Sequence, residues 1–238
     1  MPRSDTTHAR PPWLFKEYSP VGVDLGSPAA VAVYDRNQGT DPDADDALLD
    51  RLGVAQDTLL IDLACGTGSL VVQAARRGAH AHGVDISEQM LAFAQARAER
   101  ADVTAYWHRA GFLDYAHAAR PADVVTTRSA LHQLPDFWKQ QALLNAAATL
   151  RPGGTFYLRD AIVSFPPAEA AEQVQRWIDT AGRPAGEGFT KADFEMHVRE
   201  EFSTYAWIVE GMLDRAGLDT VSRTLPSATH AEFLCRRR

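Results

Sequence analysis

The stretch Leu59–Gly68, with the sequence LLIDLACGTG, decides the fold of this chain of 238 residues. Its apolar run ends in an acid and then in a turn of small residues, a pattern typical of a buried parallel strand that leads into a helix. Small residues suit such a turn because a ligand must approach the backbone closely. The helix expected over 68–77 then points its free N–H groups at that ligand. The stretch therefore predicts a loop that binds a nucleotide-like molecule.

Two features of this loop discriminate between nucleotide ligands. A dinucleotide-binding loop requires a third small residue for close packing of helix on strand, and that position is Val71 here. A phosphate-binding loop of the ATPase type requires Gly-Lys followed by Ser or Thr, and the sequence has no such tripeptide after the glycines. The acid before the turn, Asp62, suits a ligand with an ammonium and a sulfonium better than one with phosphates.

Asp62–Gly68 resembles the first motif of the class I S-adenosylmethionine-dependent methyltransferases, in particular their small-molecule members, with Ala64 where that motif has its first glycine. Four further stretches resemble later motifs of the family in the expected order: Gly83–Ser87, Ala122–Val125, Ala130–Leu134 and Leu150–Leu158. The resemblance covers roughly residues 30 to 160. It implies S-adenosylmethionine as the cofactor and an α/β fold, namely a Rossmann-like, doubly wound sheet of seven strands whose last pair is antiparallel.

The alternation of strand and helix patterns predicts a parallel sheet within a single domain over 1–238. Strands are expected at 58–63, 80–85, 103–108, 122–127 and 155–161, and helices at 68–77, 87–100 and 136–150. Helical patterns then cover 166–181, 191–199 and 204–216, and β-like runs cover 218–225 and 231–235. We expect residues 163–202 to be a helical insertion that caps the substrate. Residues 1–30 are expected to form a loose tail over 1–12 and an aromatic cover, in which Trp13, Phe15 and Tyr18 lie over the acceptor pocket.

Composition narrows the class of partner. A net charge of −7 argues against a general nucleic-acid surface, so we expect a small-molecule acceptor. Cys65 and Cys235 lie far apart in sequence and form no disulfide framework or metal-spacing pattern. The sequence has no apolar run long enough to span a bilayer, and Met1–Pro12 lacks the apolar core of a signal peptide. We therefore expect a cytoplasmic protein without membrane contact, and the oligomeric state stays open.

Asp85 is the main candidate for holding the ribose of the cofactor. It stands at the expected carboxyl end of the second strand, next to Ile86, and a carboxylate there can accept hydrogen bonds from both ribose hydroxyls. The alternative is an aspartate that only caps a turn or helix. The resemblance places Asp62 near the ammonium of the methionine moiety, whereas the alternative has it bracing the loop that contains Ala64 and Gly66.

Four further residues are cofactor-binding candidates through the resemblance. Related sequences often carry an aspartate where this chain has Gly111, and that aspartate bonds the adenine amino group. Here the backbone at Gly111 would meet the adenine edge, and Phe112 would pack on its face or in the core. Tyr34 lies in a segment whose tyrosine touches the methionine carboxylate in many related enzymes. Arg128 follows the fourth strand and is assigned either to that carboxylate or to an anionic acceptor.

His132 is the candidate catalytic residue, because the motif series places it at the mouth of the site. It is either a general base for an acceptor O–H or N–H, or a histidine that fixes the loop after the fourth strand. His80 and His82 alternate along a strand without further ligand candidates nearby, so we expect no metal site. The sequence predicts methyl transfer to a small organic molecule. An NAD(P)-dependent oxidoreductase and a cofactor-binding module without turnover remain the alternatives.

Overall fold

The computed structural model describes residues 12–19 and 28–238, and its centre is a seven-stranded sheet. The strand order is β3-β2-β1-β4-β5-β9-β8, in which β1 to β5 run parallel and β9 is antiparallel to both β5 and β8. The strands are β1 Leu59–Leu63, β2 His80–Asp85, β3 Tyr106–Arg109, β4 Ala122–Arg128, β5 Leu150–Asp160, β8 Leu218–Ser227 and β9 His230–Arg237. The predicted doubly wound α/β sheet with an antiparallel last pair is confirmed.

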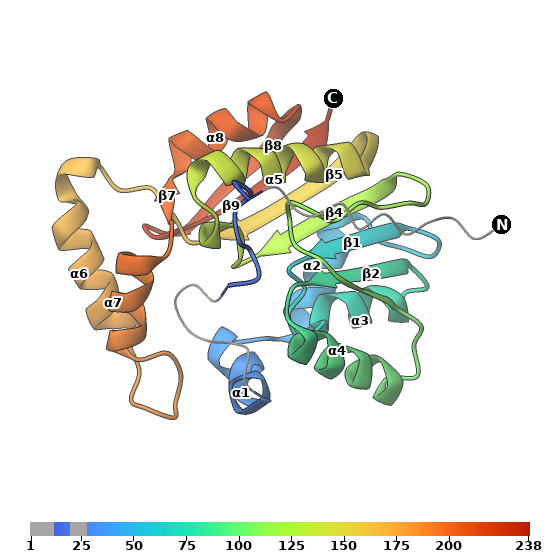
Figure 1. The fold of residues 1–238 in the computed structure, drawn as a ribbon, viewed down its shortest axis with the longest axis horizontal. Coiled ribbons are helices and arrows are strands. Elements are labelled where there is room, and N and C mark those ends of the chain that lie inside the picture. Colours follow the sequence, from blue (N-terminus) through green and yellow to red (C-terminus); the bar gives the residue numbers. More distant parts are fainter. Residues whose placement is uncertain (1–11, 20–27) are drawn as a thin grey trace.

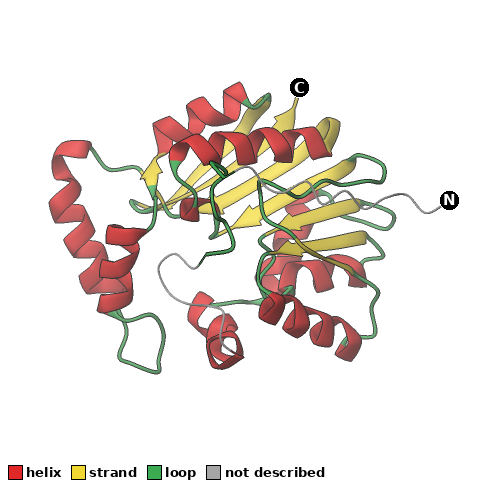
Figure 2. Cartoon of the chain, viewed as in Figure 1, coloured by secondary structure: helices red, strands yellow, loops and turns green. Residues whose placement is uncertain are grey.

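Helices cover both faces of this sheet (Figures 1 and 2). On one face lie α5 Asp136–Thr149 and α8 Ala206–Arg215, and on the other α2 Pro42–Leu52, α3 Ser69–Arg76 and α4 Glu88–Arg100. Because successive strand residues point to opposite faces, neighbours in β1 enter different cores: Ile61 packs with the α5 side and Leu60 with the α2 and α3 side. Burial on both faces explains why the β1 stretch is continuously apolar.

The loop after β1 turns sharply because three of its residues adopt the left-handed region. Ala64, Gly66 and Gly68 have φ of 58°, 53° and 74°. A Cβ at Gly68 would lie 2.6 Å from the Trp107 ring, so only glycine fits there. The turn brings the start of α3 next to the end of β1. Ser87 caps α4 by accepting the Met90 N–H, as its position in the sequence predicts.

Several element boundaries differ from the expectations. The helix expected to reach residue 150 ends at Thr149, and β5 begins directly at Leu150, so the Gly153-Gly154 pair lies inside the strand. The third strand is shorter than expected. A helix that the sequence patterns did not predict, α1 Pro28–Gln38, precedes α2. The loose tail expected over 1–12 lies, apart from its last residue, outside the described residues, as does 20–27 of the expected cover.

The insertion after β5 stands at the end of the sheet toward which β1 and β4 point (Figure 1). It consists of β6 Ile162–Val163, a short 3-10 turn at Pro167–Glu169, α6 Ala170–Ala181, α7 Lys191–Glu200 and β7 Thr204–Tyr205. Its two short strands pair in parallel, and the Phe202 N–H donates to the His132 carbonyl at 2.8 Å. We call this insertion, from β6 to β7, the cap. These contacts fix it beside the loop after β4. Within the described residues, every helix is too short or too polar to cross a membrane.

Candidate functional site

A first cavity of about 340 Å³ lies at the carboxyl ends of β1 and β2, the edge where open α/β sheets bind ligands. Seven of the nine predicted cofactor-binding residues line it: Tyr34, Ala64, Gly66, Asp85, Ile86, Gly111 and Phe112. Asp62 and Arg128 do not line it. The structure therefore gathers most of the predicted set, from the ends of three strands and one helix, around a single cavity.

Asp85 organises the polar side of this cavity. Its Oδ2 accepts the Gly66 N–H at 2.9 Å, and its Oδ1 accepts the Ser87 N–H at 2.8 Å. Burial raises the pKa of this carboxyl group, while the two backbone N–H groups partly oppose the rise. The carboxylate thus ties the loop after β1 to the loop after β2. Each of its oxygens keeps a second lone pair for a ligand hydroxyl.

Asp62 and Arg128 belong to a buried polar network behind the loop. Asp62 accepts a hydrogen bond from Thr126 Oγ1 at 2.6 Å, and Arg128 pairs with Asp45 at 2.7 Å. Asp45 also accepts from Ser69 Oγ at the start of α3. Burial raises the pKa of Asp62 to about 6, although Arg128 and Thr126 act to lower it. The network braces the glycine loop, and the expected cofactor contacts of both residues stay predictions.

Glu17 is a site residue that the motif reading missed. Its buried carboxylate accepts the N–H groups of Phe112 and Leu113 at 2.8 and 3.0 Å, and it lines the first cavity. A Cβ at Gly111 would come within 2.5 Å of Glu17 Oε2. The acid of an N-terminal segment therefore fills the space where a side chain at Gly111 would stand. No spacing rule links the two positions, which are 94 residues apart in the sequence.

The N-terminal aromatics cover the first cavity and not the acceptor side. Phe15 and Tyr18 line the first cavity, whereas Trp13 is 71% exposed and stacks on Trp138. This differs from the expectation that all three would lie over the acceptor pocket. The physical reason is the anchoring of this segment by Glu17 on the loop after β3.

A second cavity of about 270 Å³ lies between the sheet and the cap. It shares Tyr34, Ser129 and Gln133 with the first cavity, so these residues form the boundary between the two. Ser129 has a φ of 52°, a conformation that non-glycine residues rarely adopt and that often marks a functional site. Burial raises the pKa of Tyr34 well above its usual range, so its hydroxyl stays protonated.

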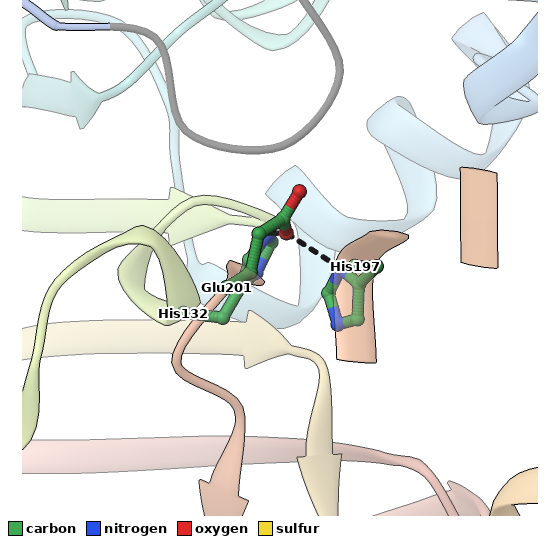
Figure 3. A group of neighbouring side chains, drawn as sticks. All are labelled: His132, His197 and Glu201. Atoms are coloured by element: carbon green, nitrogen blue, oxygen red, sulfur yellow. Dashed lines mark ion pairs between the residues drawn. The ribbon is translucent and has the colours of Figure 1, made fainter. Parts of the chain in front are cut away.

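His132 faces this second cavity from the loop after β4, within a chain of charged groups. Its Nδ1 pairs with Asp160, and its Nε2 lies 2.9 Å from Glu201 Oε2. Glu201 also accepts from His197 Nδ1 at 2.5 Å (Figure 3). Burial would lower the pKa of His132, but the two carboxylates outweigh it and raise the pKa to about 10. At neutral pH His132 therefore holds its proton in this arrangement, and its assignment as a general base stays a prediction.

Aromatic side chains from the cap form the remaining wall of the second cavity. Trp177 contacts Phe194 and His197 edge-on, with ring centroids 5.1 and 5.3 Å apart, and Phe189 packs near Phe194. Trp177 and Phe189 line this cavity, whereas Trp207, at the start of α8, is exposed. The cavity thus combines flat apolar surface with a charged end.

The sequence comparisons agree with this geometry. Residues 60–154 match a family model described as a methyltransferase domain. The chain is 32% identical over 115 residues to a ubiquinone biosynthesis O-methyltransferase of Aeromonas salmonicida. The aligned stretch is 48% of this chain and 47% of that protein. A protein of the same description from Coxiella burnetii is 30% identical over 98 residues, 41% of each chain. The chain spans about half the length or less of the curated relatives it matches.

Solved structures with the same fold match over more of the chain. Magnesium protoporphyrin IX methyltransferase from Synechocystis, with bound SAH, aligns with a TM-score of 0.63 at 17% identity and covers 93% of this chain and 91% of that one. A geranyl diphosphate methyltransferase in complex with SAM aligns with a TM-score of 0.64 at 14% identity. The alignment covers 90% of this chain and 93% of that one. A [4+2]-cyclase, SpnF, aligns with a TM-score of 0.62 at 14% identity. The alignment covers 82% of this chain and 80% of that one. At these identities the likeness shows the fold.

Proposed function

Since this chain belongs to the class I S-adenosylmethionine-dependent methyltransferase family, we propose that it transfers a methyl group to a small organic acceptor. The observation that carries the proposal is the pair of cavities that meet at Tyr34, Ser129 and Gln133. The first cavity is lined by most of the residues predicted to bind the cofactor, and the second lies under the cap. When bound, S-adenosylmethionine would supply a methyl group on a positively charged sulfur, and this sulfur would leave readily as a neutral thioether when the acceptor displaces it.

The residues around the first cavity fit this cofactor. The Asp85 carboxylate suits two neighbouring hydroxyl groups of a ribose, and the small residues Ala64 and Gly66 let a ligand approach the backbone. Glu17 presents a carboxylate beside Gly111, where related sequences carry an aspartate for the adenine amino group. We assign Glu17 to that role. Phe15 and Phe112 add apolar surface for the adenine ring.

The chain's own residues contribute positioning and exclusion of water. Tyr34, Ser129 and Gln133 would fix the distance between donor and acceptor, and the cap would close the second cavity from solvent. Aromatic walls at Trp177 and Phe194 favour an acceptor with a flat apolar body and a polar group directed at His132. His132 remains the candidate catalytic residue, because it faces this cavity.

Transfer of a labelled methyl group from S-adenosylmethionine into a fractionated metabolite extract tests the proposal. We expect label to appear in one small-molecule fraction with the wild-type protein and to be lost in the Asp85→Ala variant. Label in no fraction, despite measurable cofactor binding, would favour the binding module without turnover. Reduction or oxidation of a substrate with NAD(P) would favour the oxidoreductase, which the buried Val71 in α3 argues against.

A further inference from the structure

Three side chains with metal-binding atoms converge at the charged end of the second cavity (Figure 3). His132 comes from the loop after β4, His197 from α7, and Glu201 directly follows α7. Their ligand atoms all lie within 4.8 Å of one another. Zinc–nitrogen and zinc–oxygen bonds of about 2.0–2.2 Å place neighbouring ligand atoms roughly 3–3.5 Å apart. A small closing movement of these side chains would therefore suffice to bring all three to one ion.

The two histidines are held as metal ligands are usually held. Metal-binding histidines almost always bond their second ring nitrogen to a carboxylate, a carbonyl or another polar partner. His132 turns its Nδ1 to Asp160 and leaves Nε2 facing Glu201. His197 turns its Nε2 to Ser203 Oγ at 2.8 Å and leaves Nδ1 facing the same carboxylate. Each ring thus has one anchored nitrogen and one nitrogen directed at the common point.

Charge and ligand type narrow the kind of ion. When an ion takes the place of the proton that His132 holds, the two negative charges of Asp160 and Glu201 remain in a site whose side chains are at least 86% buried, and a divalent cation would balance them. Two imidazoles and one carboxylate suit zinc, iron, cobalt or nickel, whereas magnesium prefers a shell of oxygen atoms and water. From the sequence we expected no metal site: His197 and Glu201 are four residues apart, but His132 lies 65 residues before His197.

We propose that His132, His197 and Glu201 bind one divalent transition-metal ion on the wall of the second cavity, with Asp160 and Ser203 orienting the two imidazoles. Three protein ligands leave positions open toward the cavity. An acceptor hydroxyl or carboxylate oxygen would occupy one of them, and the ion would lower the pKa of a bound hydroxyl group. This role toward the acceptor rests on the proposed function, whereas metal binding itself does not.

A cobalt titration tests the site without cofactor or acceptor. We would strip the full-length protein with a chelator, add Co²⁺, follow its visible absorption bands, and then displace Co²⁺ with Zn²⁺ or Mg²⁺. We expect one equivalent to bind saturably, zinc to displace it and millimolar magnesium not to. A folded wild-type protein that shows no saturable spectrum would overturn the proposal, whatever the result for cofactor binding.

Variants assign the ligands. We expect His197→Ala and Glu201→Gln each to weaken cobalt binding at least tenfold, and Asp160→Asn to weaken it about 10- to 100-fold by releasing the His132 ring. Glu200→Gln is the matched control, because Glu200 is the neighbouring carboxylate, half exposed and paired with Arg199, and it should bind as the wild type does. Circular dichroism confirms folding of each variant. Wild-type affinity in folded His197→Ala and Glu201→Gln would show that the cluster only braces the cap and would overturn the proposal.

Discussion

At the scale of single residues, Ala64 is the clearest departure from the methyltransferase motif that the loop after β1 resembles. It holds a φ of 58° in the loop after β1, at the position where the resembling motif has glycine. The left-handed region costs a residue with a Cβ about 1–2 kcal/mol, and glycine avoids this cost but loses more conformational entropy when the chain folds. The methyl group is thus tolerated in the turn, but under strain.

We therefore expect Ala64→Gly to raise the free energy of unfolding by about 0.5–1 kcal/mol in a urea titration. The control is Ala101→Gly, at a helix end with a φ of −86°, which has no such strain to relieve and should be neutral or destabilising. A lower stability of the Ala64→Gly variant would show that the methyl group contributes packing that outweighs the strain.

The second prediction for single residues moves the acidic side chain from Glu17 to the position of Gly111. Glu17→Ala should weaken binding of S-adenosylhomocysteine about tenfold, the cost of one hydrogen bond to a charged group. Gly111→Asp alone should also weaken it, because the new side chain meets the Glu17 carboxylate. In the double variant the aspartate has the space that Glu17 vacates, so binding should recover toward the wild-type value in calorimetry. Additive losses in the double variant would argue that the two positions do not share a role.

At the scale of elements, β2 and β3 carry a pair of histidines that titrate abnormally. His82 Nδ1 and His108 Nε2 are 2.9 Å apart, and His117 meets His82 edge-on. Burial and the neighbouring imidazoles lower the pKa of His82 to about 4. An unfolded histidine has a pKa near about 6.5, so between these values the unfolded state binds the extra proton. Stability should therefore fall as the pH drops from about 6.5 to about 4.

His82→Phe should flatten this part of the stability profile, because the ring stacking on Tyr106 persists while the titrating group is gone. Unfolding in urea at several pH values measures the slope. Since the His82 side chain remains partly exposed to solvent, we expect a difference of only about 1 kcal/mol between the two ends of this range. His80→Asn, at an exposed position of the same strand, is the control and should keep the wild-type slope. Equal slopes for all three proteins would mean that other groups set the acid sensitivity.

The two covers of the site should respond to different ligands. Residues 12–19 close the first cavity, whereas α6 and α7 close the second. Hydrogen exchange should therefore slow in 12–19 and around Phe112 when S-adenosylhomocysteine is added, because ligand contacts suppress local opening. Slowing in α6 and α7 should require an acceptor or a metal ion. Equal protection of both segments by S-adenosylhomocysteine alone would mean that the cap also responds to the cofactor.

At the scale of the whole molecule, the sequence predicted what depends on local patterns. The apolar run of β1, the small residues after it and the order of later motifs were enough for the sheet and for most of the first cavity. The helices of the cap were also predicted, because proline and glycine residues interrupt the helical patterns between them. These features are readable because a strand, a turn and a helix each impose their own spacing on the chain.

What the sequence did not predict depends on contacts between distant segments. Glu17 reaches the loop after β3, His197 reaches His132, and Arg128 pairs with Asp45. No periodicity relates such positions, and only the folded chain brings them together. The pKa of His132 is an example: Asp160 and Glu201 raise it, and neither carboxylate can be identified as a neighbour from the sequence around His132.

A calorimetric titration measures whether the first cavity binds the cofactor of methyl transfer through Asp85. S-adenosylhomocysteine should bind the wild-type protein, and NAD should not. Asp85→Ala should weaken binding about tenfold to several hundredfold, since hydrogen bonds to a charged group are worth about 1.5–3 kcal/mol each. Asp219→Ala, an exposed carboxylate on β8, should leave it unchanged. Tight binding of NAD with no response to S-adenosylhomocysteine would contradict the account.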